Sequence, residues 1–379
     1  MRAILRALGN PHKAYQSIIV AGTNGKGSTS MMLHSILDAA GYRSGIYTSP
    51  HLVDIRERWM IGREPVSEEV LIESIGTLRA GADHAGITPT YFEALTLLAF
   101  IIFEREQREI VVLEVGMGGR LDATNVVRPL ASLITPIGFD HTEYLGNTIR
   151  KIAFEKAGVI HRGAIVLTNN HDPVVLSVLH DRARSFACPF VEVHSDGTER
   201  PPLAGDFQRE NMALAIRAAE MLRTRLPNIT PEAIERGIAA TRWRGRLERT
   251  RVAGKDVWVD GCHNAHGARA VAPFIAANLP RPRLLVFGIM TDKNVDEVAS
   301  VLFPLFDQII TTEPYPPRSA LAADLAAKAK AMGIPARPVA DPHAALTEAL
   351  RSDLTTVFVG GSLYLAGAAI EFLDDARKH

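Results

Sequence analysis

A glycine-rich loop between a strand-like run and a helix-like run carries the clearest chemical signal in the sequence. The loop, Gly22-Thr23-Asn24-Gly25-Lys26-Gly27-Ser28, follows the apolar run SIIVA. In this setting, backbone N–H groups and the start of a helix bind phosphate groups. Lys26 is expected to bridge the β and γ phosphates, and Ser28 lies where a hydroxyl approaches the metal. The loop departs from the common G-x-x-x-x-G-K-[ST] spacing because a glycine separates Lys26 from Ser28. It predicts nucleotide binding but does not indicate what receives the phosphate.

Further polar residues follow two other apolar runs. Glu114 ends the run IVVLE, and Asp140-His141-Thr142 comes soon after the run at 131–137. An acid at the carboxyl end of a strand beside a phosphate-loop strand is well placed to be a metal ligand, and His141 is predicted to face the same crevice. A lone histidine is more often structural, and magnesium prefers oxygen ligands. From the residues alone, Lys156 is interpreted as an exposed helix lysine.

The elements that would position these residues alternate between short apolar runs and longer helical patterns, which indicates βα units and a mainly parallel sheet. The stretch at 94–103 predicts a buried helix, because it is about half of the ~20 residues that a membrane span needs. The pattern predicts strands at 17–21, 108–115, 131–137, 164–168, 256–259, 283–287 and 355–359, and helices at 26–40, 208–222, 267–277, 319–332 and 342–351.

Composition limits the class of protein. Lys+Arg is 42 and Asp+Glu is 42, so 42 − 42 gives a formal charge of zero, which argues against generic nucleic-acid or anionic-membrane binding. The two cysteines, Cys188 and Cys262, cannot form a disulfide framework or a four-cysteine zinc site. No signal-peptide pattern is visible at the N-terminus. A reducing cytoplasm is the expected location.

Five arginines crowd into the eleven residues TRWRGRLERTR at 241–251, and a new α/β pattern follows them. This change predicts a domain boundary within 246–250. A solvated linker is the simplest explanation of the cluster.

Eight stretches then coincide, in order and approximate spacing, with one family. In these stretches the chain resembles folylpolyglutamate synthases and dihydrofolate synthases of the Mur ligase superfamily, and the resemblance covers nearly its whole length. The stretches are AGTNGKGST, YTSPHLVDIRERWMIG, TYFEALTLLAF, LEVGMGGRLDATNVV, GFDHTEYLGNTIRKIAFEKAGVI, WRGRLE, VDGCHN and GGSLYLAG.

The resemblance implies an α/β fold of two domains. Residues 1–247 would form a P-loop, Mur-ligase-like ATPase domain with a mainly parallel sheet that binds ATP and the pterin. Residues 248–379 would form a smaller, Rossmann-like glutamate-ligase domain. The implied activity is an ATP-dependent amide ligase: ATP phosphorylates a folate or dihydropteroate carboxylate, and the amine of L-glutamate attacks the acyl phosphate. A monomer is implied, with small-molecule substrates and with neither nucleic acid nor membrane as a partner.

The resemblance also assigns roles by position. Ser49, Glu114 and His141 look like the ligands of Mg²⁺, and Lys156 occupies the lysine that the family carbamylates. Lys26, Lys156 and His263 would be catalytic, and Ser362 would meet the incoming glutamate. The positions resembling ATP contacts are Thr23, Asn24, Gly25, Lys26, Gly27, Ser28, Asn211, Arg246 and Asp260. Those resembling the pterin pocket are Thr90, Tyr91, Phe92, Glu93, Leu121, Asp122 and Ala123; core packing is the alternative for Tyr91 and Phe92.

Two alternatives to a folate-type ligase stay open from the sequence. One is a Mur-type amide ligase that acts on a different carboxylate, because the chain starts only about twenty residues before the phosphate loop. The other is a non-catalytic nucleotide-gated binding module.

Overall fold

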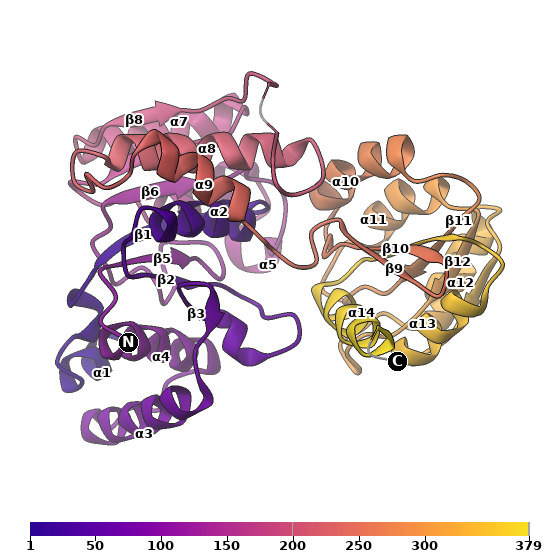
Figure 1. Cartoon of the computed structure of the whole chain (residues 1–379), viewed down its shortest axis with the longest axis horizontal. Helices are drawn as coiled ribbons and strands as arrows, with labels where there is room; N and C mark the ends of the chain where they lie inside the picture. The colour runs from indigo at the N-terminus through magenta and orange to yellow at the C-terminus, as the bar shows by residue number, and fades with distance from the viewer. Residues whose placement is uncertain (199, 378–379) are drawn as a thin grey trace. The chain divides into compact units, whose positions relative to one another are not determined.

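The computed structural model describes residues 1–198 and 200–377, which form two compact units (Figure 1). The first unit holds Met1–His51, Ile55–Pro202 and Gln208–Arg242. The second holds Leu52–Asp54, Leu203–Phe207 and the chain from Trp243 onward. The units thus divide after Arg242, whereas the sequence places the boundary after residue 247. Two short segments that precede that boundary also belong to the second unit.

The first unit is built on an eight-stranded sheet with the order β4-β3-β2-β5-β1-β6-β7-β8. The neighbouring strands in the run β2-β5-β1-β6-β7-β8 all pair in parallel. At one edge of the sheet, β3 pairs antiparallel with β2, and β4 pairs antiparallel with β3. The central strands β1 and β5 consist of almost wholly buried residues, as expected for strands covered on both faces. The strands are β1 Gln16–Ala21, β2 Ser44–Tyr47, β3 Trp59–Ile61, β4 Glu64–Pro65, β5 Ile110–Glu114, β6 Ala131–Ile134, β7 Ile165–Thr168 and β8 Phe190–Glu192.

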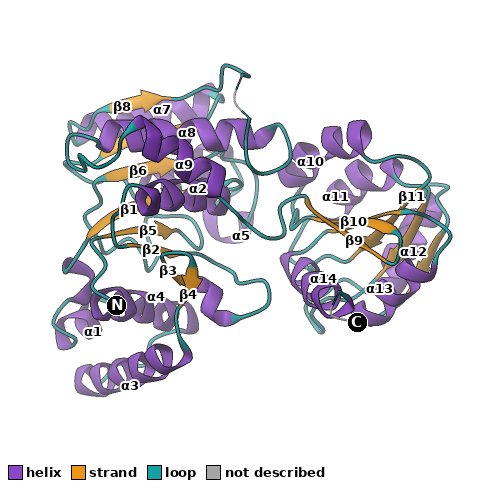
Figure 2. Ribbon diagram, in the orientation of Figure 1, coloured by secondary structure: helices purple, strands orange, loops and turns teal. Residues whose placement is uncertain are grey.

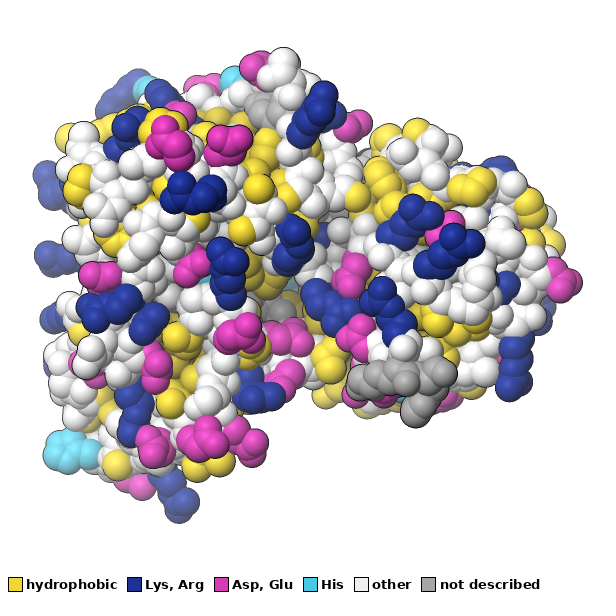
Figure 3. All heavy atoms as spheres, in the orientation of Figure 1, with side chains coloured by type: hydrophobic (Ala, Val, Ile, Leu, Met, Phe, Trp, Pro, Cys, Tyr) yellow, Lys and Arg dark blue, Asp and Glu magenta, His cyan; other side chains and the backbone are white. Residues whose placement is uncertain are grey.

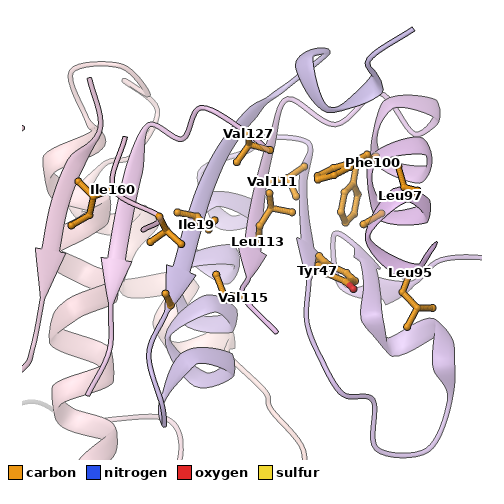
Figure 4. Packing of buried hydrophobic residues seen from close by; sticks show 14 of the residues in the cluster. Ile19, Tyr47, Leu95, Leu97, Phe100, Val111, Leu113, Val115, Val127 and Ile160 are labelled. Carbon is orange, nitrogen blue, oxygen red and sulfur yellow. The ribbon is translucent and has the colours of Figure 1, made fainter. Parts of the chain in front are cut away.

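Helices cover this sheet (Figure 2). The apolar run at 94–103 lies in the buried helix α4, as predicted, and its residues Leu97 and Phe100 pack toward Tyr47 and the strand side chains (Figure 4). No helix among the described residues is both long and apolar enough to cross a membrane. The helices are α1 Arg2–Ala7, α2 Lys26–Ala39, α3 Glu68–Ala85, α4 Tyr91–Arg105, α5 Thr142–Leu145, α6 Ile149–Ala157, α7 Pro173–Ser185, α8 Phe207–Leu222 and α9 Pro231–Ala240.

The second unit has its own six-stranded sheet, with the order β13-β12-β11-β14-β10-β9. Only β9 runs antiparallel to its neighbour; the other pairs are parallel. The strands are β9 Glu248–Val252, β10 Lys255–Val259, β11 Arg283–Phe287, β12 Gln308–Thr311, β13 Ala336–Pro338 and β14 Thr356–Gly360. The helices are α10 Ala265–Asn278, α11 Val295–Leu302, α12 Ala322–Ala331, α13 Pro342–Arg351 and α14 Leu363–Ala376. The α/β class and the mainly parallel sheets are confirmed.

Two predicted elements end or begin differently. The strand predicted at 131–137 stops at Ile134, because the next residues turn to hold the glycine-rich loop: Thr23 N–H donates to Pro136 O at 2.9 Å. The helix predicted from residue 319 begins at Ala322. Ser319 instead forms a β-bridge with Met290, and its hydroxyl accepts from Tyr315 N–H at 2.8 Å.

Candidate active site

The glycine-rich loop joins β1 to α2 and lies against the end of β6. Gly22 has a φ of 150°, and a Cβ there would meet Thr135 Oγ1 at 1.9 Å, so this position accepts only glycine without rearrangement. The Thr23 hydroxyl donates to Gly138 O at 3.1 Å and accepts from Gly138 N–H at 3.0 Å. The residue that caps α2 is Gly25, which has no side chain to cover the first N–H groups of the helix. The loop therefore presents a helix N-terminus suited to a phosphate group.

Two amides from α8 lie beside this loop. A Cβ on Gly25 would meet Asn211 Oδ1 at 2.4 Å, which places the buried Asn211 against the turn. Asn211 Nδ2 donates to Gln208 Oε1 at 2.9 Å, and Gln208 Nε2 donates to Ser28 Oγ at 3.3 Å. Gln208 was missed in the sequence. Its position three residues before Asn211, on the same helix face, is the signal that points to it.

Two lysines converge on the loop. Lys26 Nζ donates to Thr23 O at 3.0 Å, and Lys156 Nζ donates to Gly22 O at 2.6 Å. The interpretation of Lys156 as an exposed helix lysine is wrong: only 4% of the residue is exposed. Burial, followed by the positive charge of Lys26, lowers the pKa of Lys156 to about 7. Asp140 and Asp122 act on this pKa in the opposite direction.

The residues predicted to bind metal come from the end of β5 and from the loops that follow β2 and β6. Glu114 ends β5 and is buried, and Ser49 N–H donates to its Oε2 at 3.3 Å. Val20 of β1 pairs with Glu114, so this carboxylate lies one strand away from the start of the glycine-rich loop. His141 has a φ of 50° and follows Asp140, whose carboxylate accepts the His141 N–H at 2.9 Å.

A cavity of about 930 Å³ lies in the first unit, and both Ser49 and His141 line it. The buried Arg58 also lines it and donates from Nε to His51 Nδ1 at 2.9 Å. Arg58 was missed because arginines in a polar stretch such as DIRER give no sign of burial. Of the residues predicted for the pterin pocket, the cavity is lined by Thr90, Phe92, Glu93, Leu121, Asp122 and Ala123. Tyr91 lies outside this set and is 67% exposed, so it is neither a wall residue nor a core residue.

Several residues that line the cavity also accept hydrogen bonds from backbone N–H groups of their own loops. Thr90 and Glu93 form a capping box at the start of α4, and the Glu93 carboxylate accepts from Thr90 N–H at 2.9 Å. That backbone hydrogen bond is the main cause that lowers the pKa of Glu93. The Asp122 carboxylate accepts N–H groups from Met117 and Thr124, each at 3.0 Å. Burial nevertheless raises the pKa of Asp122.

In the second unit, the predicted residues cluster around the end of β10. The buried Asp260 accepts from Leu247 N–H at 2.9 Å and from Cys262 N–H at 2.7 Å, while burial raises its pKa and the Arg246 charge opposes that rise. His263 Nδ1 lies 2.9 Å from Gly261 O. Ser362 accepts from Tyr364 N–H at 3.1 Å as the N-cap of α14. The side chains of Asp260 and Ser362 therefore both accept hydrogen bonds from backbone N–H groups in the structure.

Known families and structures match the chain closely. A family model described as the Mur ligase middle domain matches residues 20–200, and one described as the Mur ligase, glutamate ligase domain matches residues 245–363. The chain is 33% identical to the dihydrofolate synthase/folylpolyglutamate synthase of Bacillus subtilis, over 100% of this chain and 93% of that protein. It is also 33% identical to the folylpolyglutamate synthase of Lacticaseibacillus casei, over 98% and 92%.

Solved structures agree. The folylpolyglutamate synthase of Mycobacterium tuberculosis, complexed with ADP and AMPPCP, matches with a TM-score of 0.89 and 30% identity, covering 98% of this chain and 94% of that one. Escherichia coli FolC in complex with DHPP and ADP matches with a TM-score of 0.87 and 28% identity, covering 100% and 92%.

Proposed function

Because the chain belongs to the folylpolyglutamate synthase and dihydrofolate synthase family of the Mur ligase superfamily, we propose that the site in its first unit activates a carboxylate for amide formation. The protein is an ATP-dependent ligase that joins L-glutamate to a folate or pteroate carboxylate. In the proposed route, the acceptor carboxylate takes the γ-phosphoryl group of ATP, the glutamate amine displaces phosphate from the acyl phosphate, and ADP and phosphate leave.

One observation carries this assignment to the first unit. Ser49 lines the large cavity and also bonds Glu114, whose strand partner Val20 leads into the phosphate loop. A carboxylate held in the cavity is therefore close to a phosphate held by the loop. Catalysis of phosphoryl transfer depends on such positioning and on neutralising charge. Lys26 supplies a positive charge at the loop for the phosphoryl group that moves.

Of the three residues predicted to bind Mg²⁺, Ser49 and Glu114 offer the donor atoms that this ion prefers, and His141 does not. A buried carboxylate and a hydroxyl are hard oxygen donors, which Mg²⁺ prefers, and an imidazole is a weaker choice. When bound, Mg²⁺ neutralises charge on the phosphate oxygens. The hydrogen bond from Ser49 N–H holds the Glu114 carboxylate beside Ser49, which lines the cavity.

The surroundings of Lys156 support carbamylation of this side chain. The reaction needs a neutral amine, and a pKa of about 7 makes a large share of the amine neutral near neutral pH. Lys26, whose charge acts on Lys156, would stabilise the carbamate anion. The amine attacks CO₂, loses one proton and keeps one N–H, which can still donate to Gly22 O.

In the second unit, we propose that Arg246 and Asp260 hold the nucleotide, with His263 and Ser362 near its phosphates and the incoming glutamate. Asp260 fixes the backbone of Leu247 and Cys262, which are the direct neighbours of Arg246 and His263. Monomeric state and cytoplasmic location stay predictions.

The deciding experiment is an ADP-release assay with purified full-length protein. Dihydropteroate, tetrahydrofolate and UDP-muramyl intermediates are each tested against a panel of amino acids. Release that depends on both L-glutamate and one of the two pterin acceptors is expected, and the acceptor identifies dihydrofolate synthase, folylpolyglutamate synthase or both. Release that depends on a UDP-muramyl acceptor would replace this assignment, and no acceptor-dependent release would favour the non-catalytic binding module.

A further inference from the structure

Two histidines and a glutamate, none of which was assigned a role above, come together on the surface of the first unit. His171 follows β7, His194 follows β8, and Glu210 lies in the first turn of α8. Their candidate ligand atoms all lie within 4.8 Å of one another. The two imidazole rings are stacked, with centroids 4.8 Å apart and an interplanar angle of 26°. Both histidines are exposed and Glu210 is half-buried.

Backbone contacts hold these three segments together without using an imidazole nitrogen. Val193 N–H donates to Thr168 O at 2.8 Å, which fixes the residue before His194 to the end of β7. Asn169 Nδ2 donates to Glu210 O at 3.1 Å. Ser195 N–H lies 3.3 Å from each Glu210 carboxylate oxygen. These contacts fix the backbone on both sides of His194 and at Glu210, which reduces the entropy lost when the side chains converge on one ligand.

We propose that His171, His194 and Glu210 bind one divalent transition-metal ion such as Zn²⁺. Two imidazoles and a carboxylate are a common ligand set for zinc, with a water in the fourth position, whereas magnesium prefers oxygen ligands alone. Donors around a tetrahedral zinc ion lie roughly 3.4 Å apart, given bonds of about 2.1 Å. The candidate ligand atoms lie within 4.8 Å of one another, and rotation of the two exposed imidazoles would bring them toward that spacing.

The position of the site in the fold gives it a consequence for the nucleotide loop. Glu210 precedes Asn211, which lies against Gly25, and follows Gln208, which bonds Ser28. A bound ion would tie the first turn of α8 to the ends of β7 and β8. Because the ion binds the folded protein and not the unfolded chain, it is expected to raise the melting temperature of the first unit by a few degrees.

Cobalt(II) serves as the probe, because its visible absorption reports a tetrahedral nitrogen and oxygen site. It is titrated into the full-length protein in saturating Mg²⁺, which competes at the oxygen-rich position of Ser49 and Glu114. His171→Ala and His194→Ala are each expected to weaken Co²⁺ binding by at least about tenfold, since even outer-shell partners of metal ligands are worth that much. Glu210→Gln should also weaken it.

Two control variants make the result specific. His180, an exposed histidine on α7 that packs on Phe190, is the matched control, and His180→Ala should leave Co²⁺ affinity unchanged. His141→Ala should also retain the absorption. The proposal is overturned if the His171→Ala/His194→Ala double variant binds Co²⁺ as tightly as the wild type, or if the absorption disappears with His141→Ala instead. Both substituted histidines are exposed, so these variants are expected to fold.

Discussion

Lys26 and Lys156 both donate to carbonyls of the glycine-rich loop, but they differ in burial and therefore in expected chemistry. For Lys26→Ala, we expect a folded protein whose rate falls by ~10²–10³, the usual effect of removing a charge that stabilises a transferring phosphoryl group. The measurement is glutamate-dependent ADP release, with circular dichroism as the check on folding. Wild-type release from a folded variant would remove Lys26 from the catalytic group.

Lys156→Ala tests the carbamate. If Lys156 carries an anionic oxygen donor, turnover should fall sharply, and acetate in solution should restore part of it by occupying the vacated space. Turnover is measured over a range of acetate concentrations, with Lys26→Ala as the control that acetate should not rescue. Full activity of Lys156→Ala without acetate would end the carbamylation hypothesis.

The lowered pKa of Lys156 also predicts a pH dependence of stability. The folded-state pKa is about 7, against an ordinary value of 10.5. Between these values the unfolded chain binds more protons than the folded one, so the contribution of Lys156 to stability increases as the pH rises from about 7 toward 10, and is constant below 7.

Lys156→Met, which keeps the length of the side chain without its charge, should remove this dependence. Nucleotide-free wild type and variant are compared by urea unfolding in CO₂-free buffer at several pH values. The variant should gain most over the wild type near pH 7, and the gain should shrink as the pH rises. A gain that is the same at every pH would contradict the shift.

At the scale of elements, two glycines inside helices have opposite surroundings. Gly237 of α9 lies on α2, where an added Cβ would meet Ile36 Cα at 2.4 Å. Gly76 of α3 has nothing within 4 Å of such a Cβ. Gly237→Ala should destabilise the protein by ~1–3 kcal/mol through overpacking. Gly76→Ala should stabilise it by ~0.5–1 kcal/mol through helix propensity.

Urea unfolding of both variants measures these effects. Equal stability of Gly237→Ala and wild type would mean that α9 moves away from α2 without loss. A destabilised Gly76→Ala would contradict its open surroundings.

The same scale shows what a sequence can predict. The strand before Gly22 and the helix after it were predicted because an apolar run, a glycine-rich turn and a helical stripe follow one another. The edge strands β3, β4 and β8 span three residues or fewer, too short to show alternation. The burial of Lys156 gave no local signal either, because it arises when α6 packs that face on Gly22, far away in the sequence.

At the scale of the whole molecule, two sheets with separate cores predict two unfolding events. We expect the calorimetric enthalpy of the full-length protein to exceed the van't Hoff enthalpy, because each unit has its own buried cluster. Gly237→Ala should lower only the transition of the first unit. A single two-state transition shifted as a whole by this variant would show that the units unfold together.

On the surface, positive and negative side chains are interspersed on the face shown in Figure 3, in keeping with a formal charge of zero. The charges that matter for the proposed reaction are the few that lie at the loop and in the cavity.

The Asp122 carboxylate fixes its loop through the Met117 and Thr124 N–H groups, whereas the neighbouring Leu121, which also lines the cavity, is 79% exposed. The backbone shape of this wall is thus independent of the side chain at residue 121. Natural selection can therefore exchange Leu121 without unfolding the loop or disturbing the phosphate site. With the acceptor in this cavity, as proposed, a change at residue 121 would alter the acceptor that fits while the catalytic residues stay as they are.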